Sequence, residues 1–291
     1  MELCNPTVVR DLLERHGFSF SKSLGQNFLI DANIVRNIAL ASGADKNIGV
    51  VEVGPGFGVL TAELAKRAGH VVTVEIDKAI LPVLKETLAD FDNITVFNSD
   101  ILKVDLDALL AEQFPQQYEK YHVCANLPYY ITTPVLAMLI ESGKFDCITI
   151  MIQKEVAYRL AAKAGTADYG AFTVFTQFYT DAEINFTVSS SCFMPRPKVD
   201  SAVVTLHMKK EFPLEESLHK LYFRVVKGAF AQRRKTLLNS IGSVFGGQLN
   251  KEQLSACIAD CGFDLRIRGE TLTIEDFVRL TKRIDAEMRK Q

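Results

Sequence analysis

The sequence predicts an α/β protein: an open seven-stranded, mostly parallel sheet followed by a small all-helical domain. Three observations carry this prediction. Short apolar runs alternate with helical patterns from residue 48 onward, the alternation stops at residue 208, and helical spacing alone continues beyond it. With 291 residues, of which 48% are apolar, the chain can bury the cores of one large and one small domain.

Seven short apolar runs, most of them bounded by Gly, Asp, Asn or Pro, are predicted to be the strands. They are residues 49–53, 71–76, 94–97, 121–125, 147–152, 182–188 and 202–208. Strands that alternate with helices are typical of a parallel sheet covered on both faces. Ahead of them a helical pattern begins at Asp31 and ends before Gly43. Its apolar face is expected to lie against the sheet edge.

The boundary between the domains is expected at residues 209–217, where KKEFPLEES mixes charge with a proline as a linker does. Beyond it, apolar residues recur at helical spacing. They are Phe223, Val226, Phe230 and Leu237, then Leu254 and Ile258, then Phe277, Leu280 and Ile284. We therefore predict a first domain over residues 1–208 and a helical domain over residues 209–291.

Charge is divided unevenly between the two parts of the chain. Residues 1–206 hold 17 Lys and Arg against 24 Asp and Glu, whereas residues 207–291 hold 16 against 11. The stretch from 220 to 235 has no acidic residue and six basic ones: Lys220, Arg224, Lys227, Arg233, Arg234 and Lys235. Such a stretch is typical of a polyanion-binding surface, but on charge alone a solvated helix face explains it equally well.

Several classes of protein are disfavoured by composition. No apolar run approaches the roughly 18 residues of a membrane span, and Glu2, Arg10 and Asp11 stand where a cleavable signal would be apolar. The six cysteines form no CxxC pair and have no histidines at metal-ligand spacing. We expect reduced, mostly buried thiols, no metal, no membrane partner and a cytoplasmic location.

A glycine-rich loop, VVEVGPGFGVLT at residues 50–61, joins the first predicted strand to a helix. Gly54, Gly56 and Gly58 allow a tight turn and a close approach of a ligand to the backbone. The dinucleotide fingerprint GxGxxG would need Gly or Ala at the position of Val59. The loop alone is weak evidence of a site, but it favours a nucleoside over a pyrophosphate.

Carboxylates close the next two strands. Glu75 in VVTVEID can accept hydrogen bonds from both hydroxyls of a ribose, and Asp100 in FNSDIL can accept one from an adenine amine. Ile76 and Ile101, which follow them, are assigned to the same cofactor site. Each carboxylate alone is more often a helix cap. Placed with the glycine loop at three successive strand ends, they favour the functional interpretation.

The segment NLPYYITTP, residues 126–134, follows the fourth strand and resembles the Asn/Asp-Pro-Pro-Tyr signature of amino-methyltransferases. An adenine amine is a poor nucleophile because its lone pair is delocalised into the ring. The side-chain oxygen of Asn126 and the carbonyl of Leu127, held by Pro128, could accept its two N–H bonds and localise that pair. Tyr129 offers a face on which an unstacked base can lie. Without the cofactor residues, a turn before a helix explains the segment as well.

With these motifs, nearly the whole chain resembles the ribosomal RNA adenine dimethyltransferases, and among them the bacterial type that modifies two adjacent adenosines of the small subunit. Further markers are KSLGQNFL (22–29), FMPRPKVDSAV (193–203) and AFAQRRKTLLNSI (229–241). The resemblance implies a Rossmann-like methyltransferase sheet, S-adenosylmethionine as cofactor, and ribosomal RNA in an immature small subunit as partner. We expect a monomer.

The resemblance also implies roles that spacing does not reveal. Gln26, Asn27 and Leu29 would contact the cofactor, as would Asn126. Phe193 would close over the target base opposite Tyr129, although its chemistry alone predicts a core residue. Arg196 and Lys198 would lie near the RNA backbone. From the charge of the basic stretch, and not from the resemblance, we also assign five residues to RNA binding: Arg224, Lys227, Arg233, Arg234 and Lys235.

Four alternatives remain. They are a large-subunit ribosomal RNA methylase, a non-catalytic RNA-binding factor on the same fold, a DNA adenine methyltransferase and an enzyme for a small-molecule amine. The intact NLPY motif and Glu75 disfavour a purely binding role. The chain lacks an inserted domain large enough to read a DNA duplex, and the basic tail disfavours a small-molecule substrate.

Overall fold

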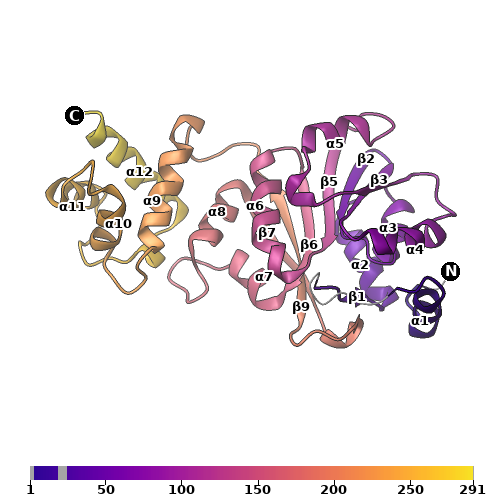
Figure 1. Cartoon of the computed structure of the whole chain (residues 1–291). Helices are drawn as coiled ribbons and strands as arrows, with labels where there is room; N and C mark the ends of the chain where they lie inside the picture. The colour runs from indigo at the N-terminus through magenta and orange to yellow at the C-terminus, as the bar shows by residue number, and fades with distance from the viewer. Residues whose placement is uncertain (1–2, 19–24, 291) are drawn as a thin grey trace. The chain divides into compact units, whose positions relative to one another are not determined.

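A computed structural model describes residues 3–18 and 25–290, and it divides the chain into two compact units (Figure 1). The sheet unit comprises Met1–Ala157 and Ala182–Met208, and the helical unit comprises Tyr158–Asp181 and Lys209–Gln291. The predicted boundary at residue 208 coincides with one of the points where the chain passes between units. Residues 158–181 also belong to the helical unit, because Tyr169 and Phe178 are buried in its core.

The sheet has seven strands in the order β4-β3-β2-β5-β6-β9-β7. Neighbours from β4 to β6 run parallel, and β9 is antiparallel to β6. The strands are β2 (Ile48–Val53), β3 (His70–Glu75), β4 (Ile94–Asn98), β5 (Lys120–Asn126), β6 (Cys147–Gln153), β7 (Thr180–Val188) and β9 (Ser201–Met208). Every residue of β2 and β3 is buried, so both faces of the sheet centre are covered. All seven predicted strands are confirmed.

Among the described residues, seven α-helices belong wholly or partly to the sheet unit. They are α1 (Pro6–Arg15), α2 (Ala32–Ala41), α3 (Val59–Ala65), α4 (Leu81–Thr87), α5 (Leu106–Glu112), α6 (Thr132–Ser142) and α7 (Lys154–Leu160). Helix α1 begins at the Asn5 cap and buries Val9 and Leu12 against the glycine loop and α4, in a cluster that includes Phe57 and Leu84.

Helix α2 begins where the sequence predicted, because the Asp31 side chain accepts hydrogen bonds from the backbone of the first turn. Its expected position at the sheet edge is wrong. The buried Ile38 shares a core cluster with Val50 of β2, Cys124 of β5 and Met151 of β6, which are middle strands. An apolar helix face needs an apolar sheet face to cover it, and the edge strands β4 and β7 are largely half-exposed.

Two short strands escaped the sequence analysis. β1 (Phe28–Leu29) and β8 (Phe193–Met194) pair antiparallel, with Leu29 opposite Phe193. This ribbon fastens the segment before α2 to the FMPRPK segment. Two residues are too few to show a period of alternation, so no pattern could predict them.

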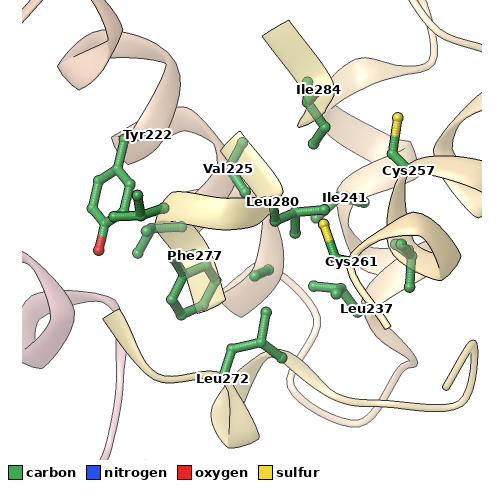
Figure 2. Close-up of a cluster of buried hydrophobic side chains, with 14 of the residues drawn as sticks. Tyr222, Val225, Leu237, Ile241, Cys257, Cys261, Leu272, Phe277, Leu280 and Ile284 are labelled. Carbon is green, nitrogen blue, oxygen red and sulfur yellow. The ribbon is translucent and has the colours of Figure 1, made fainter. Parts of the chain in front are cut away.

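The helical unit packs its helices around one core: α8 (Ala171–Tyr179), α9 (His219–Phe230), α10 (Leu237–Phe245), α11 (Lys251–Asp260) and α12 (Ile274–Met288). Figure 2 shows Tyr222 and Phe277 in this cluster, with ring centroids 6.4 Å apart in an edge-to-face arrangement. The predicted helical run through Leu237 is divided, because residues 231–236 form a turn between α9 and α10. All six cysteines are free thiols and four of them are buried.

Candidate active site

A pocket opens at the carboxyl ends of the central parallel strands, the edge where ligands bind in open α/β sheets. It is bordered by the segment before α2, by the glycine loop, by the end of β3 and by the segment after β5. Ten of the predicted site residues border it: Gln26, Asn27, Leu29, Gly54, Gly56, Glu75, Asn126, Leu127, Pro128 and Tyr129.

Five predicted residues do not border this pocket. Gly58 caps α3, and Phe193 is buried in the core with only 4% of its surface exposed. Asp100 caps the short helix after β4 by accepting a hydrogen bond from the Leu102 N–H at 3.1 Å. The other two are the half-exposed Ile76 and the buried Ile101. Their assignment to cofactor or base stays a prediction.

The glycine loop shows why two of its positions exclude a side chain. Gly54 and Gly56 adopt φ values of +70° and +58°, in the left-handed region. A Cβ on Gly56 would approach the Phe28 ring to 2.7 Å, whereas a Cβ on Gly54 would meet nothing within 4 Å. Gly54 borders the pocket, so the space that its missing side chain leaves is open to a ligand.

Glu75 ends β3 with 7% of its surface exposed. Its Oε1 accepts a hydrogen bond from the Asp77 N–H at 2.7 Å. Burial raises the pKa of Glu75 to about 7, and the Asp77 N–H partly offsets this increase. A carboxyl that borders the pocket can accept hydrogen bonds from the hydroxyl donors of a ligand.

Glu52 is a pocket residue that the sequence analysis missed. It lies on β2 with 1% exposure, and its Oε2 accepts a hydrogen bond from the Thr61 hydroxyl at 2.6 Å. Burial raises its pKa to about 7, and the charge of Glu75 acts in the same direction. The charge of Glu75 thus adds to the effect of burial in disfavouring the ionised form of Glu52. The available signal was one charged residue within an otherwise apolar strand.

Asn126 connects the segment after β5 to the segment before α2. Its Nδ2 donates a hydrogen bond to the backbone carbonyl of Asn27 at 3.1 Å. A carbonyl can only accept, so this contact assigns the amide orientation and leaves Oδ1 as an acceptor. The N–H of Leu127 donates to the Met151 carbonyl at 3.2 Å, and the hydroxyls of Tyr129 and Ser201 lie 3.1 Å apart. The loop is therefore held from several sides.

The segment before α2 forms another wall of the pocket. Gln26 donates from Nε2 to Asp77 at 2.9 Å, and Asn27 donates from Nδ2 to the Gly25 carbonyl at 3.0 Å. The rings of Phe28 and Phe57, both missed from sequence, stack with centroids 3.9 Å apart. Residues 22–24 of the KSLGQNFL motif lie outside the described residues.

Most of the basic residues assigned to RNA are exposed: Arg196, Lys198, Lys227, Arg233, Arg234 and Lys235. Arg196 donates from Nε to the Ser190 hydroxyl, and Arg233 donates to the Ala167 carbonyl. Arg224 differs, because it is half-buried, donates to the Val244 carbonyl at 2.8 Å and lies 4.3 Å from the centroid of the Phe245 ring. Its contacts are those of a packing residue.

Neither a metal-binding cluster nor a membrane-spanning helix is found among the described residues. No group of three or more His, Cys, Asp or Glu side chains is arranged to hold a metal ion in the part of the chain that the structure describes. Within the same residues, no helix combines the length and the apolar character that a membrane crossing requires.

The sheet order, the glycine loop and the acidic residue at the end of β3 define an α/β methyltransferase fold of the Rossmann-like kind. Comparison with known proteins gives the particular family. The model of the ribosomal RNA adenine dimethylase family matches residues 17–285, and the chain belongs to this family.

Relatives cover the chain almost completely. The chain is 47% identical over 282 residues to the ribosomal RNA small subunit methyltransferase A of Geobacillus kaustophilus, with 96% of each chain aligned. Among solved structures, a dimethyladenosine transferase from Plasmodium falciparum has a TM-score of 0.77 at 25% identity, covering 89% of this chain and 98% of its own. The 23S rRNA methyltransferase ErmE has a TM-score of 0.68 at 28% identity, covering 89% and 99%.

Proposed function

We propose that the protein transfers methyl groups from S-adenosylmethionine to the N6 amine of adenosines in small-subunit ribosomal RNA. The observation that carries this proposal is the pocket in which Asn126, tied to Asn27, adjoins Tyr129 and the two buried carboxyls. The substrate class rests on the family and on the relatives named for the small subunit. As in the expectation from sequence, the product is dimethyladenosine on two adjacent nucleotides.

The residues of the pocket fit the proposed cofactor. The open space at Gly54 accommodates a ligand close to the backbone, and Glu75 supplies acceptors for ribose hydroxyls. When bound, S-adenosylmethionine supplies a methyl group activated by a sulfonium. Its positive charge would favour the ionised forms of Glu52 and Glu75, which both border the pocket.

The residues after β5 would act on the adenine amine. Asn126 Oδ1 and the Leu127 carbonyl accept its N–H bonds, which turns the nitrogen lone pair away from the ring. Tyr129 offers a stacking face and is itself held through Ser201. The neutral Asn126 amide adds no charge beside a cationic ligand. After one transfer a single N–H remains, and an amide tolerates the methyl that replaces the other better than a strongly attracting carboxylate would.

We also propose that the helical unit holds the RNA through its exposed basic residues, and that the substrate is an immature small subunit in the cytoplasm during ribosome biogenesis. The monomeric state expected from sequence is part of the same proposal. Relatives named for the small subunit, at 47% identity against 28% for ErmE, support the small subunit over the large-subunit alternative.

Asn126→Ala tests the proposed function. We expect this variant to lose both methyl transfers, and Asn126→Asp to keep part of the first and less of the second. The measurement is mass spectrometry of unmodified, monomethyl and dimethyl adenosine after incubation with an immature small subunit. Because Asn126 also contacts Asn27, cofactor affinity is measured in parallel. Near wild-type dimethylation by Asn126→Ala would show that this loop does not bind the adenine amine in the proposed way.

A further inference from the structure

Tyr130 directly follows the proposed stacking residue and is not used by the proposed mechanism. With 59% of its surface exposed, it is one of the two most exposed large apolar residues among those described, together with Leu40. It lies in the short helix Tyr129–Ile131, whose first residue borders the pocket. No hydrogen bond to its hydroxyl is found within the described part of the chain.

The ring of Tyr130 nevertheless packs against another part of the chain. It lies over Gly25, where a Cβ would be 3.4 Å from both Cδ1 and Cε1 of the ring. Gly25 has φ +60°, a conformation that favours glycine. One side of the ring thus packs on the backbone of Gly25, and much of the rest is exposed to solvent.

Gly25, which lies under this ring, is connected by hydrogen bonds to Asn126, the residue proposed to bind the adenine amine. The Gly25 carbonyl accepts a hydrogen bond from the Asn27 side chain at 3.0 Å, and the Asn27 carbonyl accepts one from Asn126 at 3.1 Å. Tyr130 and Asn126 are also only four residues apart in one loop. The position of the ring relative to Asn126 is therefore fixed both along the chain and through Gly25 and Asn27.

A base that enters the pocket leaves its neighbour in the RNA without a stacking partner, and this loss opposes binding. An exposed, pre-oriented aromatic ring beside the pocket can replace that partner, because every base has a face that stacks on it. We propose that Tyr130 is a positioning residue that stacks on the nucleotide adjacent to the target adenosine. This inference rests on the proposed function and adds a second contact, one that sets the register of the RNA.

The test compares three substitutions at Tyr130. Tyr130→Phe keeps the aromatic ring, Tyr130→Leu keeps apolar bulk over Gly25 without a ring, and Tyr130→Ala removes both. We expect Leu and Ala to raise KM for the RNA substrate by about tenfold, the scale of one lost stacking contact, with kcat little changed and Phe close to wild type. Leu40→Ala removes an equally exposed apolar side chain elsewhere and should leave KM unchanged.

A binding measurement separates this inference from the proposed function. 2-Aminopurine is placed next to the target adenosine in small-subunit RNA, and its fluorescence should be quenched by the wild type and by Tyr130→Phe, but not by Tyr130→Leu or Tyr130→Ala. Equal quenching by all four proteins, or a wild-type KM for Tyr130→Leu, would overturn the stacking role. Weakened cofactor affinity in Tyr130→Ala with KM unchanged would overturn it too, and would assign the ring to holding Gly25. A wild type that quenches but methylates no adenine contradicts the proposed function alone.

Discussion

At the scale of single residues, the pocket is distinguished by two buried carboxyls, those of Glu52 and Glu75. Position in the sequence identified Glu75, because it ends a strand at the edge where ligands bind. The likeness of residues 126–134 to the signature of amino-methyltransferases identified Asn126. Neither could identify Glu52, Phe28 or Phe57, since their place in the pocket depends on which neighbours pack beside them.

Glu75→Ala should weaken binding of S-adenosylmethionine while the protein remains folded. The change removes acceptors for two ribose hydroxyls, each worth about 1.5 to 3 kcal/mol as a charged contact. Calorimetry gives the affinity, and circular dichroism checks the fold. An unchanged dissociation constant in a folded variant would rule out the ribose assignment.

Glu52→Gln should change how stability depends on pH in the cofactor-free protein. The folded pKa of Glu52 is about 7, above its ordinary value of 4.5. The protonated carboxyl therefore contributes stability that is fully present below pH 4.5 and is lost as pH rises through 7. The loss amounts to about 3 kcal/mol, on the order of 1.4 kcal/mol for each pKa unit.

Denaturant titrations of both proteins at several pH values measure this difference. Glutamine keeps the hydrogen-bonding capacity toward Thr61 but does not titrate. The free energy of unfolding of the wild type should fall relative to that of Glu52→Gln as the pH rises from 5 to 8. A constant gap over this range would show that Glu52 titrates normally.

At the scale of elements, those that carry their own pattern were predictable and those defined by distant partners were not. The central strands are buried on both faces, so each is a mostly apolar run. β1 and β8 exist only because residues 28–29 and 193–194 pair. Likewise α8 precedes β7 in sequence, but its Val174 and Phe178 are buried with residues beyond 209. Contacts between segments far apart in sequence decide such cases.

The turn between α9 and α10 carries basic residues whose proposed binding to RNA can be tested directly. Arg234→Glu with Lys235→Glu should weaken RNA binding, because both side chains are exposed in residues 231–236. Each lost phosphate contact should flatten the slope of log affinity against log salt by about 0.7 to 0.9. Reversing two other exposed charges of the helical unit, Arg266→Glu with Lys282→Glu, is the matched control. An unchanged slope in the first variant would identify the turn as a solvated surface.

At the scale of the whole molecule, each unit has buried core residues of its own. The core of the helical unit shares no buried residue with the two described core clusters of the sheet unit. The described residues that border the pocket all belong to the sheet unit, and the basic stretch 220–235 belongs to the helical unit. Cofactor binding and RNA binding should therefore be separable by mutation.

Hydrogen–deuterium exchange with and without S-adenosylmethionine tests this separation. A ligand at one hundred times its dissociation constant stabilises the unit that binds it by about 2.7 kcal/mol. Slower exchange is expected in residues 25–29, in the glycine loop and in residues 126–131, which border the pocket or lie beside it. Helices α9 to α12 should exchange as before, and the Arg234→Glu, Lys235→Glu variant should show the same protection as the wild type. Protection that extends through α9 to α12 would mean that the cofactor stabilises both units together, and the two activities would then not be divisible between them.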